Sequence, residues 1–267
     1  MTAIQPCALL LLVGPDWRVE TASANVAMLG DFKPALVVGQ PLSDLIGSKA
    51  IHALRNRLAW LASDESEVQD FGEEWGGVTL DLRAIRNEDC HLIEAELAVE
   101  PRLPDGIGMV RSMSDRLSGD DPVALATQAM QQLAALTGFE RILLSDREGG
   151  PIAANGGKEL TPALEAAALT RLIADRDAEP VSLIGEEGSK LLSRAAYRAP
   201  CDDERAMLES LGSAAAMSMP LKIDGRFVAA LHAYHSTPRR VGAERRSVAR
   251  LFAERLVARM ARQGFGF

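Results

Sequence analysis

The segment that most constrains the fold of this chain lies near its C-terminal end. Residues 218–239 contain two apolar runs joined by Asp224-Gly225, a dipeptide that accepts positive φ values at both central positions of a two-residue turn. This pattern predicts a β-hairpin. Alternation along the second strand places Leu231, Ala233 and His235 on one face and Ala230, His232 and Tyr234 on the other. One of the two histidines therefore points toward the side where a ligand could lie.

The composition indicates a globular protein of two modest domains. The chain has 267 residues, of which 47% are hydrophobic, and this is enough to bury a core in each domain. Its net charge of −8 argues against a general affinity for nucleic acid or anionic membranes, because both require clustered positive charge. Six arginines between residues 245 and 262 are the local exception. They fit either the solvated face of a helix, which we favour, or a phosphate-binding surface.

Three cysteines, Cys7, Cys90 and Cys201, lie far apart in the sequence and form neither a CxxC pair nor a disulfide framework. This usage predicts a reducing, cytoplasmic location. Residues 8–13 are apolar, but the run is only six residues long and lacks the flanks of a signal peptide. We expect a buried strand there and no membrane span.

The first hundred residues predict a small α/β domain. Strands are expected at 8–13, 18–22, 78–85 and 91–97, the last two joined by a turn at 87–89, with helices at 23–29 and 48–62. Strands, then central helices, then an antiparallel hairpin is the order of elements in a PAS domain. A Pro- and Gly-rich break at 101–108 marks the boundary, which gives domains of 1–105 and 106–267.

The second domain begins with a connecting helix at 109–117 and a helix that opens at Asp121-Pro122 and ends at Gly138. A strand at 139–145, helices at 162–174 and 203–211, the hairpin and a final helix at 243–262 follow. The final helix carries an apolar stripe that needs a partner surface, either its own sheet or a second copy. The stripe consists of Val248, Leu251, Phe252, Leu256 and Met260.

Ordered motifs along the chain resemble those of bacterial phytochromes. They include Ile4-Gln-Pro6, Ala22-Ser-Ala-Asn25, Leu136-Thr-Gly-Phe139, Arg171-Leu-Ile-Ala-Asp175, Pro180-Val181, Leu192-Ser-Arg194, Tyr197-Arg198 and residues 225–238. The resemblance implies an α/β fold of the α+β type, in which a PAS domain is followed by a GAF domain, each an antiparallel sheet with flanking helices. It also implies a figure-of-eight knot, with Ile4 threaded through a lasso at 180–200.

The same resemblance implies candidate cofactor-binding residues for biliverdin. Arg171 and Arg198 match arginines that pair with the propionates, Ser218 matches a propionate-binding hydroxyl, and His235 matches a histidine that hydrogen-bonds the last pyrrole ring. Guanidinium forks suit carboxylates geometrically. Each arginine alone also fits a structural ion pair, and His235 alone also fits a satisfied strand histidine.

Several family features are missing, so the resemblance implies a degenerate module. The attachment cysteine would precede Ile4, where the chain has only three residues, and Asp203 stands in the place of the plant-type cysteine. Residues 159–166 lack the Asp-Ile-Pro motif, and Glu204 stands where a histidine stacks on the bilin. Because the chain ends just after the final predicted helix, we expect neither a PHY domain nor an output kinase.

No catalytic motif and no metal-ligand spacing is found in the sequence, so we expect a protein that is not an enzyme. Two functions remain. The first is a non-catalytic sensory or signalling protein with a degenerate pocket, acting through an unidentified protein partner. The second is a photoreceptor-like module that binds biliverdin or another tetrapyrrole without a covalent bond. In either case we expect a homodimer formed through the C-terminal helix, with no nucleic acid and no membrane as partner.

Overall fold

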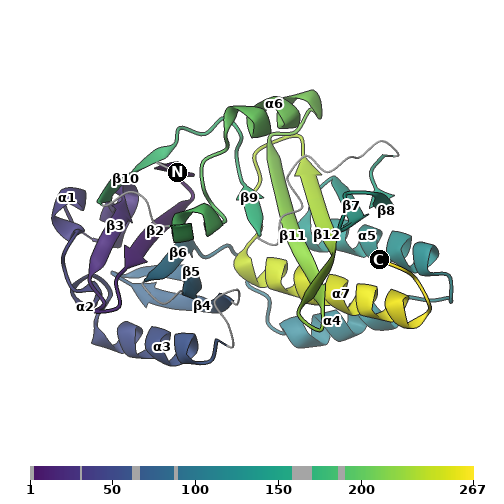
Figure 1. Cartoon of the computed structure of the whole chain (residues 1–267), viewed down its shortest axis with the longest axis horizontal. Helices are drawn as coiled ribbons and strands as arrows, with labels where there is room; N and C mark the ends of the chain where they lie inside the picture. Colours follow the sequence, from purple (N-terminus) through teal and green to yellow (C-terminus); the bar gives the residue numbers. More distant parts are fainter. Residues whose placement is uncertain (1–2, 31, 62–66, 87–89, 158–169, 186–189) are drawn as a thin grey trace. The chain divides into compact units, whose positions relative to one another are not determined.

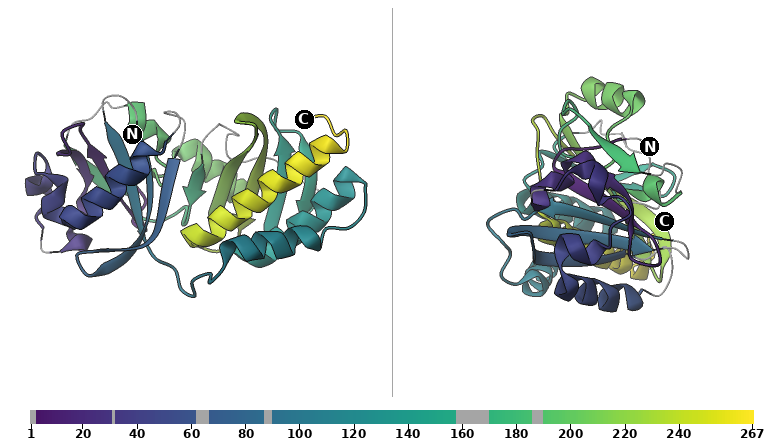
Figure 2. Two further views of the ribbon diagram at one scale, coloured as in Figure 1. Left: turned by 90° about the horizontal axis from the view of Figure 1, so that it is seen from below. Right: turned by 90° about the vertical axis from the view of Figure 1, so that its left-hand side faces the viewer.

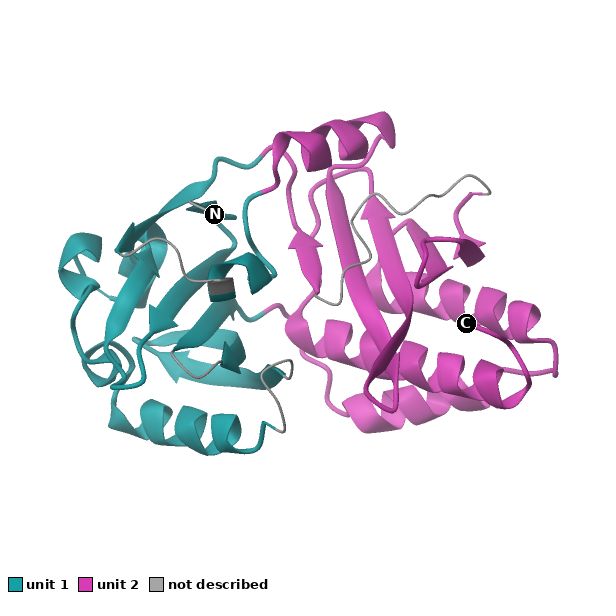
Figure 3. Ribbon diagram, in the orientation of Figure 1, with its two compact units in different colours: residues 1–98, 178–199 teal, residues 99–177, 200–267 magenta. Residues whose placement is uncertain are grey.

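The structure is a computed structural model that describes residues 3–30, 32–61, 67–86, 90–157, 170–185 and 190–267. Figure 1 and Figure 2 show the course of the chain. Two compact units are distinguished (Figure 3): residues 1–98 with 178–199, and residues 99–177 with 200–267. The boundary at 98 lies close to the one expected at 105. The addition of residues 178–199 to the first unit has no counterpart in the sequence analysis.

The first unit is built on a seven-stranded antiparallel sheet with the order β1-β10-β3-β2-β6-β5-β4. The strands are β1 (Ala3–Ile4), β2 (Ala8–Val13), β3 (Val19–Ser23), β4 (Glu67–Trp75), β5 (Val78–Arg86), β6 (His91–Leu97) and β10 (Val181–Gly185). The predicted strands at 8–13, 18–22, 78–85 and 91–97 are confirmed to within one residue at each end. Strands β1, β4 and β10 were not predicted.

Every residue of β2 is buried, because both faces of this central strand are covered. Leu9 and Leu11 face a large core, while Leu10 and Leu12 face a second, smaller one. The larger core includes residues of the 3₁₀ helix η1 (Ala24–Leu29) and the helices α1 (Pro34–Val37), α2 (Leu42–Ile46) and α3 (Ser48–Ala59). Two covered faces explain why β2 is a continuous apolar run.

Residues 178–199 complete the smaller core of the first unit. Leu191 of the 3₁₀ helix η2 (Lys190–Arg194) packs there with Ile4. Ile4 pairs with Val181 of β10 and forms an isolated bridge with Arg198. The N-terminal strand therefore lies between the two ends of this segment. The predicted knot itself stays a prediction.

The second unit contains a five-stranded antiparallel sheet with the order β8-β7-β12-β11-β9. Its strands are β7 (Arg141–Asp146), β8 (Pro151–Asn155), β9 (Arg171–Ile173), β11 (Ala215–Ile223) and β12 (Arg226–His235). The hairpin β11–β12 confirms the prediction from Asp224-Gly225. The helix expected at 162–174 is wrong over its last residues, because Arg171–Ile173 pair with β11 as a strand. Its earlier residues up to 169 lie outside the described ones.

Helices α4 (Gly106–Asp115), α5 (Pro122–Thr137) and α7 (Ala243–Arg262) form a layer on one face of this sheet, and α6 (Asp202–Ser210) packs on the other (Figure 2). The predicted limits of α5 are confirmed. Asp121 accepts the N–H groups of Val123 and Ala124 at the start, and Gly138 takes the left-handed conformation at the end.

The apolar stripe of α7 packs against its own unit. Val248, Phe252, Leu256 and Met260 are buried, and only Leu251, at 44% exposure, remains accessible. Helix α7 contacts α4, α5, β11 and β12, which cover the stripe. The stripe thus packs on its own unit, the first of the two alternatives, and the homodimer through the C-terminal helix stays a prediction. None of the helices in the described ranges is long and apolar enough to cross a membrane.

Candidate functional site

A row of polar side chains crosses the sheet of the second unit. Ser218 pairs with Arg171 of β9 on one side and with His232 of β12 on the other, and His232 in turn pairs with Leu143 of β7. Directly paired residues of antiparallel strands share a face, so these side chains project together. Ser145, two residues beyond Leu143, belongs to the same face.

This face is the one on which α6 packs. Leu208 of α6 forms a small apolar cluster with Leu143, Ile173, Ala216 and Tyr234. Arg171, Ser218 and His232 are buried, with at most 3% of each residue exposed. Buried polar groups are costly unless they are paired, so the partners of each one decide what the site can bind.

Arg171 is paired with Glu204 of α6. Its Nε donates to Oε1 at 2.8 Å and its Nη2 donates to Oε2 at 2.7 Å, the two-pronged geometry in which a guanidinium binds a carboxylate. Nη1 donates to the carbonyl of Leu172 at 3.1 Å. Glu204 also accepts the backbone N–H of Cys201 at the start of α6. The carboxylate therefore joins β9 to the first turn of the helix.

His232 and Ser145 form a second buried pair, with 3.1 Å between Nε2 and Oγ. Burial lowers the pKa of His232 to about 4, because a charged imidazole loses its hydration there. The ring is thus neutral at pH 7. Its Nδ1 is buried without a hydrogen-bond partner in the described part of the chain, so this atom could hydrogen-bond a ligand.

Two of the four predicted ligand residues, Arg171 and Ser218, are brought together on this face. His235 is not, since alternation along β12 turns it to the other face. There it lies beside Phe139 and Glu140 and hydrogen-bonds with Thr237. Arg198 belongs to the first unit and donates to the carbonyl of Ala195 at 3.3 Å.

No role was predicted from the sequence for Ser145 or His232, and Glu204 was not expected to pair with Arg171. Alternation along the strand had already placed His232 and His235 on opposite faces, and the structure shows that His232 is the one on the face of Ser218. The spacing of Glu204 and Arg171 in the sequence does not indicate that their side chains pair. The described residues contain no group of three or more His, Cys, Asp or Glu that could hold a metal ion.

The chain belongs to the GAF domain family, whose model matches residues 121–260, and the PAS fold model matches residues 1–98. Together these two domains make it a phytochrome-type PAS–GAF module, as the ordered motifs predicted. No curated protein sequence matches the chain.

Solved structures share this fold across nearly the whole chain. The photosensory core module of the Stigmatella aurantiaca phytochrome has a TM-score of 0.76 at 21% identity, over 98% of this chain and 58% of that one. This chain thus spans little more than half of that module. The chromophore-binding domain of an unusual bacteriophytochrome from R. palustris has a TM-score of 0.75 at 22% identity, over 98% and 95% of the two chains.

Proposed function

We propose that this chain is a non-catalytic sensory or signalling module that has lost the chromophore anchor of its phytochrome-like relatives and acts through a protein partner. The observation that carries this proposal is the pairing of Arg171 with Glu204. A propionate would need the same guanidinium fork that Glu204 already occupies. The residues at this point therefore do not fit a biliverdin carboxylate.

Displacing Glu204 would cost more than one ion pair. The carboxylate also accepts the N–H of Cys201, so a ligand that took its place on Arg171 would leave the start of α6 without this cap. Glu204 supplies the carboxylate within the chain, at no cost in association entropy, whereas a free ligand must lose translational freedom to deliver one. The internal pair is therefore favoured over a propionate.

The Ser145–His232 pair supports a non-catalytic function. A serine nucleophile needs a histidine base that is itself oriented by a third group. Here the Nδ1 that would meet that third group has no partner in the described ranges. Ser145 and His232 are both fully buried, so a substrate could not reach the hydroxyl without local opening.

Mixing the purified protein with biliverdin and recording its absorbance tests the proposal. We expect the spectrum of free pigment, without a sharpened and shifted red or far-red band. Such a band in the unmodified protein would contradict the proposal that the chromophore anchor has been lost. Biliverdin at the same concentration in buffer alone supplies the reference spectrum of the free pigment.

The alternative function is a photoreceptor-like module that holds biliverdin non-covalently. The polar atoms of Ser218 and His232 on the face covered by α6 favour it, because the unpartnered Nδ1 could receive a ligand hydrogen bond. In that case Arg171→Ala and Arg198→Ala should each weaken binding by about 1.5–3 kcal/mol, the scale of a charge-assisted hydrogen bond. Unchanged titration curves in both variants would exclude this function.

The cytoplasmic location, the homodimer and the signalling partner are further parts of the proposal. Cys7, Cys90 and Cys201 take part in no disulfide bond among the described residues, which agrees with a reducing compartment. Sedimentation of the purified protein at tens of micromolar tests the homodimer, and a monomer at that concentration would contradict it.

A further inference from the structure

The helical layer of the second unit contains a groove with a volume of about 340 Å³. It lies between α4 and α5, on the side of the sheet opposite to α6. Residues 109, 112 and 113 of α4, residue 116 just after that helix, and residues 132, 135 and 136 of α5 line it, a spacing that selects one face of each helix. The volume falls at the lower end of the range of about 300–1,000 Å³ typical of small-molecule sites.

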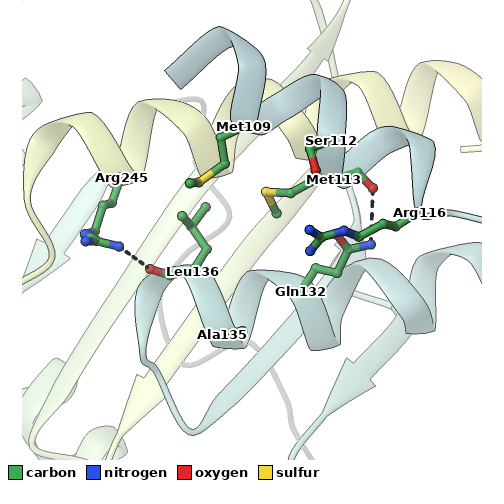
Figure 4. A pocket seen from close by; sticks show the side chains of 8 residues that line it. All are labelled: Met109, Ser112, Met113, Arg116, Gln132, Ala135, Leu136 and Arg245. Atoms are coloured by element: carbon green, nitrogen blue, oxygen red, sulfur yellow. Dashed lines mark hydrogen bonds between the residues drawn. The ribbon is translucent and has the colours of Figure 1, made fainter. Parts of the chain in front are cut away.

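The floor of this groove is apolar and adaptable. Met109 and Met113 project from α4 toward Leu136 of α5 (Figure 4). Methionine side chains are unbranched and polarisable, so they adjust to the shape of an apolar ligand. Met113 and Leu136 are nearly buried, with exposed fractions of 6% and 9%, and thus form a floor more than an outer surface.

The ends of the groove are cationic. Arg245 of α7 lies at one end and Arg116, just after α4, lies at the other (Figure 4). Within the described ranges, Arg245 donates to two backbone carbonyls, those of Leu136 and Pro101, each at 3.4 Å. Arg116 has no carboxylate partner among the described residues, and none of the eight lining residues is acidic. In a chain of net charge −8, two such guanidinium groups beside an apolar floor are complementary to an amphipathic anion.

One wall also offers a hydrogen-bond acceptor. Gln132 donates through Nε2 to the carbonyl of Met113 at 3.2 Å, and its Oε1 is buried without a partner in the described part of the chain. A buried acceptor of this kind costs free energy until a donor meets it. A ligand hydroxyl or N–H group at this wall would satisfy it after a small rotation of the amide.

We propose that this groove binds a small monocarboxylate with a flexible apolar chain, its carboxylate on Arg116 and its chain along Met113, Met109 and Leu136. The site is independent of the one under α6, because the two lie on opposite faces of the sheet. Its occupation is therefore separate from the question of the bilin.

Calorimetric titration of the full chain with decanoate tests this site. We expect saturable binding that Ala135→Phe weakens at least tenfold, because the new ring fills the groove from the exposed side of α5. Arg116→Gln should weaken it about tenfold, whereas Arg111→Gln, an exposed arginine of α4 outside the lining, should leave it unchanged. Circular dichroism and thermal unfolding verify that each variant folds.

Several outcomes would contradict the proposed ligand site. One is the absence of decanoate binding to the unmodified protein, and another is equal binding by Ala135→Phe and Arg116→Gln, which would place the ligand elsewhere. Equal binding of decyltrimethylammonium would show that charge plays no part. If Ala135→Phe instead converts a dimer into a monomer in sedimentation while decanoate fails to bind, the groove is a contact between copies of this chain.

Discussion

The carboxylate of Glu204 occupies both donor positions on one edge of the Arg171 guanidinium, at 2.8 and 2.7 Å. Only 3% of the Arg171 side chain and 17% of the Glu204 side chain are exposed. Breaking a buried pair by removing one partner leaves an uncompensated charge, which costs more than the pair itself contributes. Loss of either side chain should therefore destabilise the packing of α6 on β9, and the pair occupies the guanidinium edge that a propionate would need under the alternative function.

The buried histidine predicts a pH dependence of stability. The pKa of His232 is about 4 in the folded protein, below its ordinary value of 6.5, so the unfolded chain binds more protons between these two values. Stability is complete above pH 6.5 and falls as the pH decreases toward 4. Between pH 7 and pH 5 this group alone should cost about 2 kcal/mol. In urea unfolding, His232→Gln should lack this part of the loss of stability between pH 7 and pH 5. His52→Gln, a variant of an exposed histidine, should retain it. A parallel loss in all three proteins would contradict the assignment.

Alanine substitutions at two adjacent glycines in the turn between β4 and β5 should differ strongly in their effect on stability. A Cβ on Gly76 would lie 1.7 Å from the carbonyl oxygen of Leu29, whereas a Cβ on Gly77 would meet nothing within 4 Å. Both have positive φ, 58° and 80°, so alanine at either costs about 1–2 kcal/mol in backbone strain. Gly76→Ala should cost at least about 3 kcal/mol more than Gly77→Ala, since the backbone of Leu29 must move. Equal unfolding midpoints would refute this contact.

Glu94 should hold the end of the 178–199 segment on the first sheet. Its carboxylate accepts the N–H groups of Ala196 and Tyr197 at 3.0 and 2.9 Å and pairs with Arg83. Glu94→Ala should cost about 3 kcal/mol and accelerate hydrogen exchange at both amides. Tyr197→Phe, which removes the bond from the hydroxyl to Glu96, should cost about 1 kcal/mol and leave that exchange slow. Fast exchange in both variants, or in neither, would show that Glu94 is not the anchor.

Substitutions at two neighbouring residues of α7 should distinguish an effect on folding from an effect on assembly. Phe252 is fully buried and Leu251 is 44% exposed, so Phe252→Glu should prevent folding of the second unit. Leu251→Glu should leave the circular dichroism spectrum unchanged. If a homodimer forms through α7, Leu251→Glu is the variant that should weaken it in sedimentation. A stable, folded Phe252→Glu protein would contradict the observed packing.

The fold could be predicted where local patterns are strong. The buried strand β2, the caps of α5 and the turn of the β11–β12 hairpin follow from apolar runs, Asp121 and Asp224-Gly225. Strand β4 gave no such signal because only its last residue, Trp75, is buried. Residues 171–173 are too short a strand to be recognised without their partner, and we assigned them to a helix.

The site could be predicted only in part, because a β-bulge decides which histidine of β12 shares the face of Ser218. Counted outward from the turn, an unbroken hairpin pairs Ser218 with Leu231 and puts His235 on the face of Ser218. The observed bulge between Leu221 and Lys222 shifts the register by one residue, so that Ser218 pairs with His232. A shift of one residue exchanges the two faces of the strand. The residues of the turn give no indication of this bulge.

The central claim is that Glu204 blocks Arg171, and a biliverdin titration of Glu204→Ala beside Asp203→Ala tests it most directly. Asp203 is exposed and adjacent, so it controls for the loss of one negative charge. If Glu204 blocks Arg171, Glu204→Ala should bind biliverdin at least tenfold more tightly than the unmodified protein and be stabilised by it in thermal unfolding, while Asp203→Ala should behave like the unmodified protein. Equal affinity in all three proteins, or weaker binding in Glu204→Ala, would contradict it.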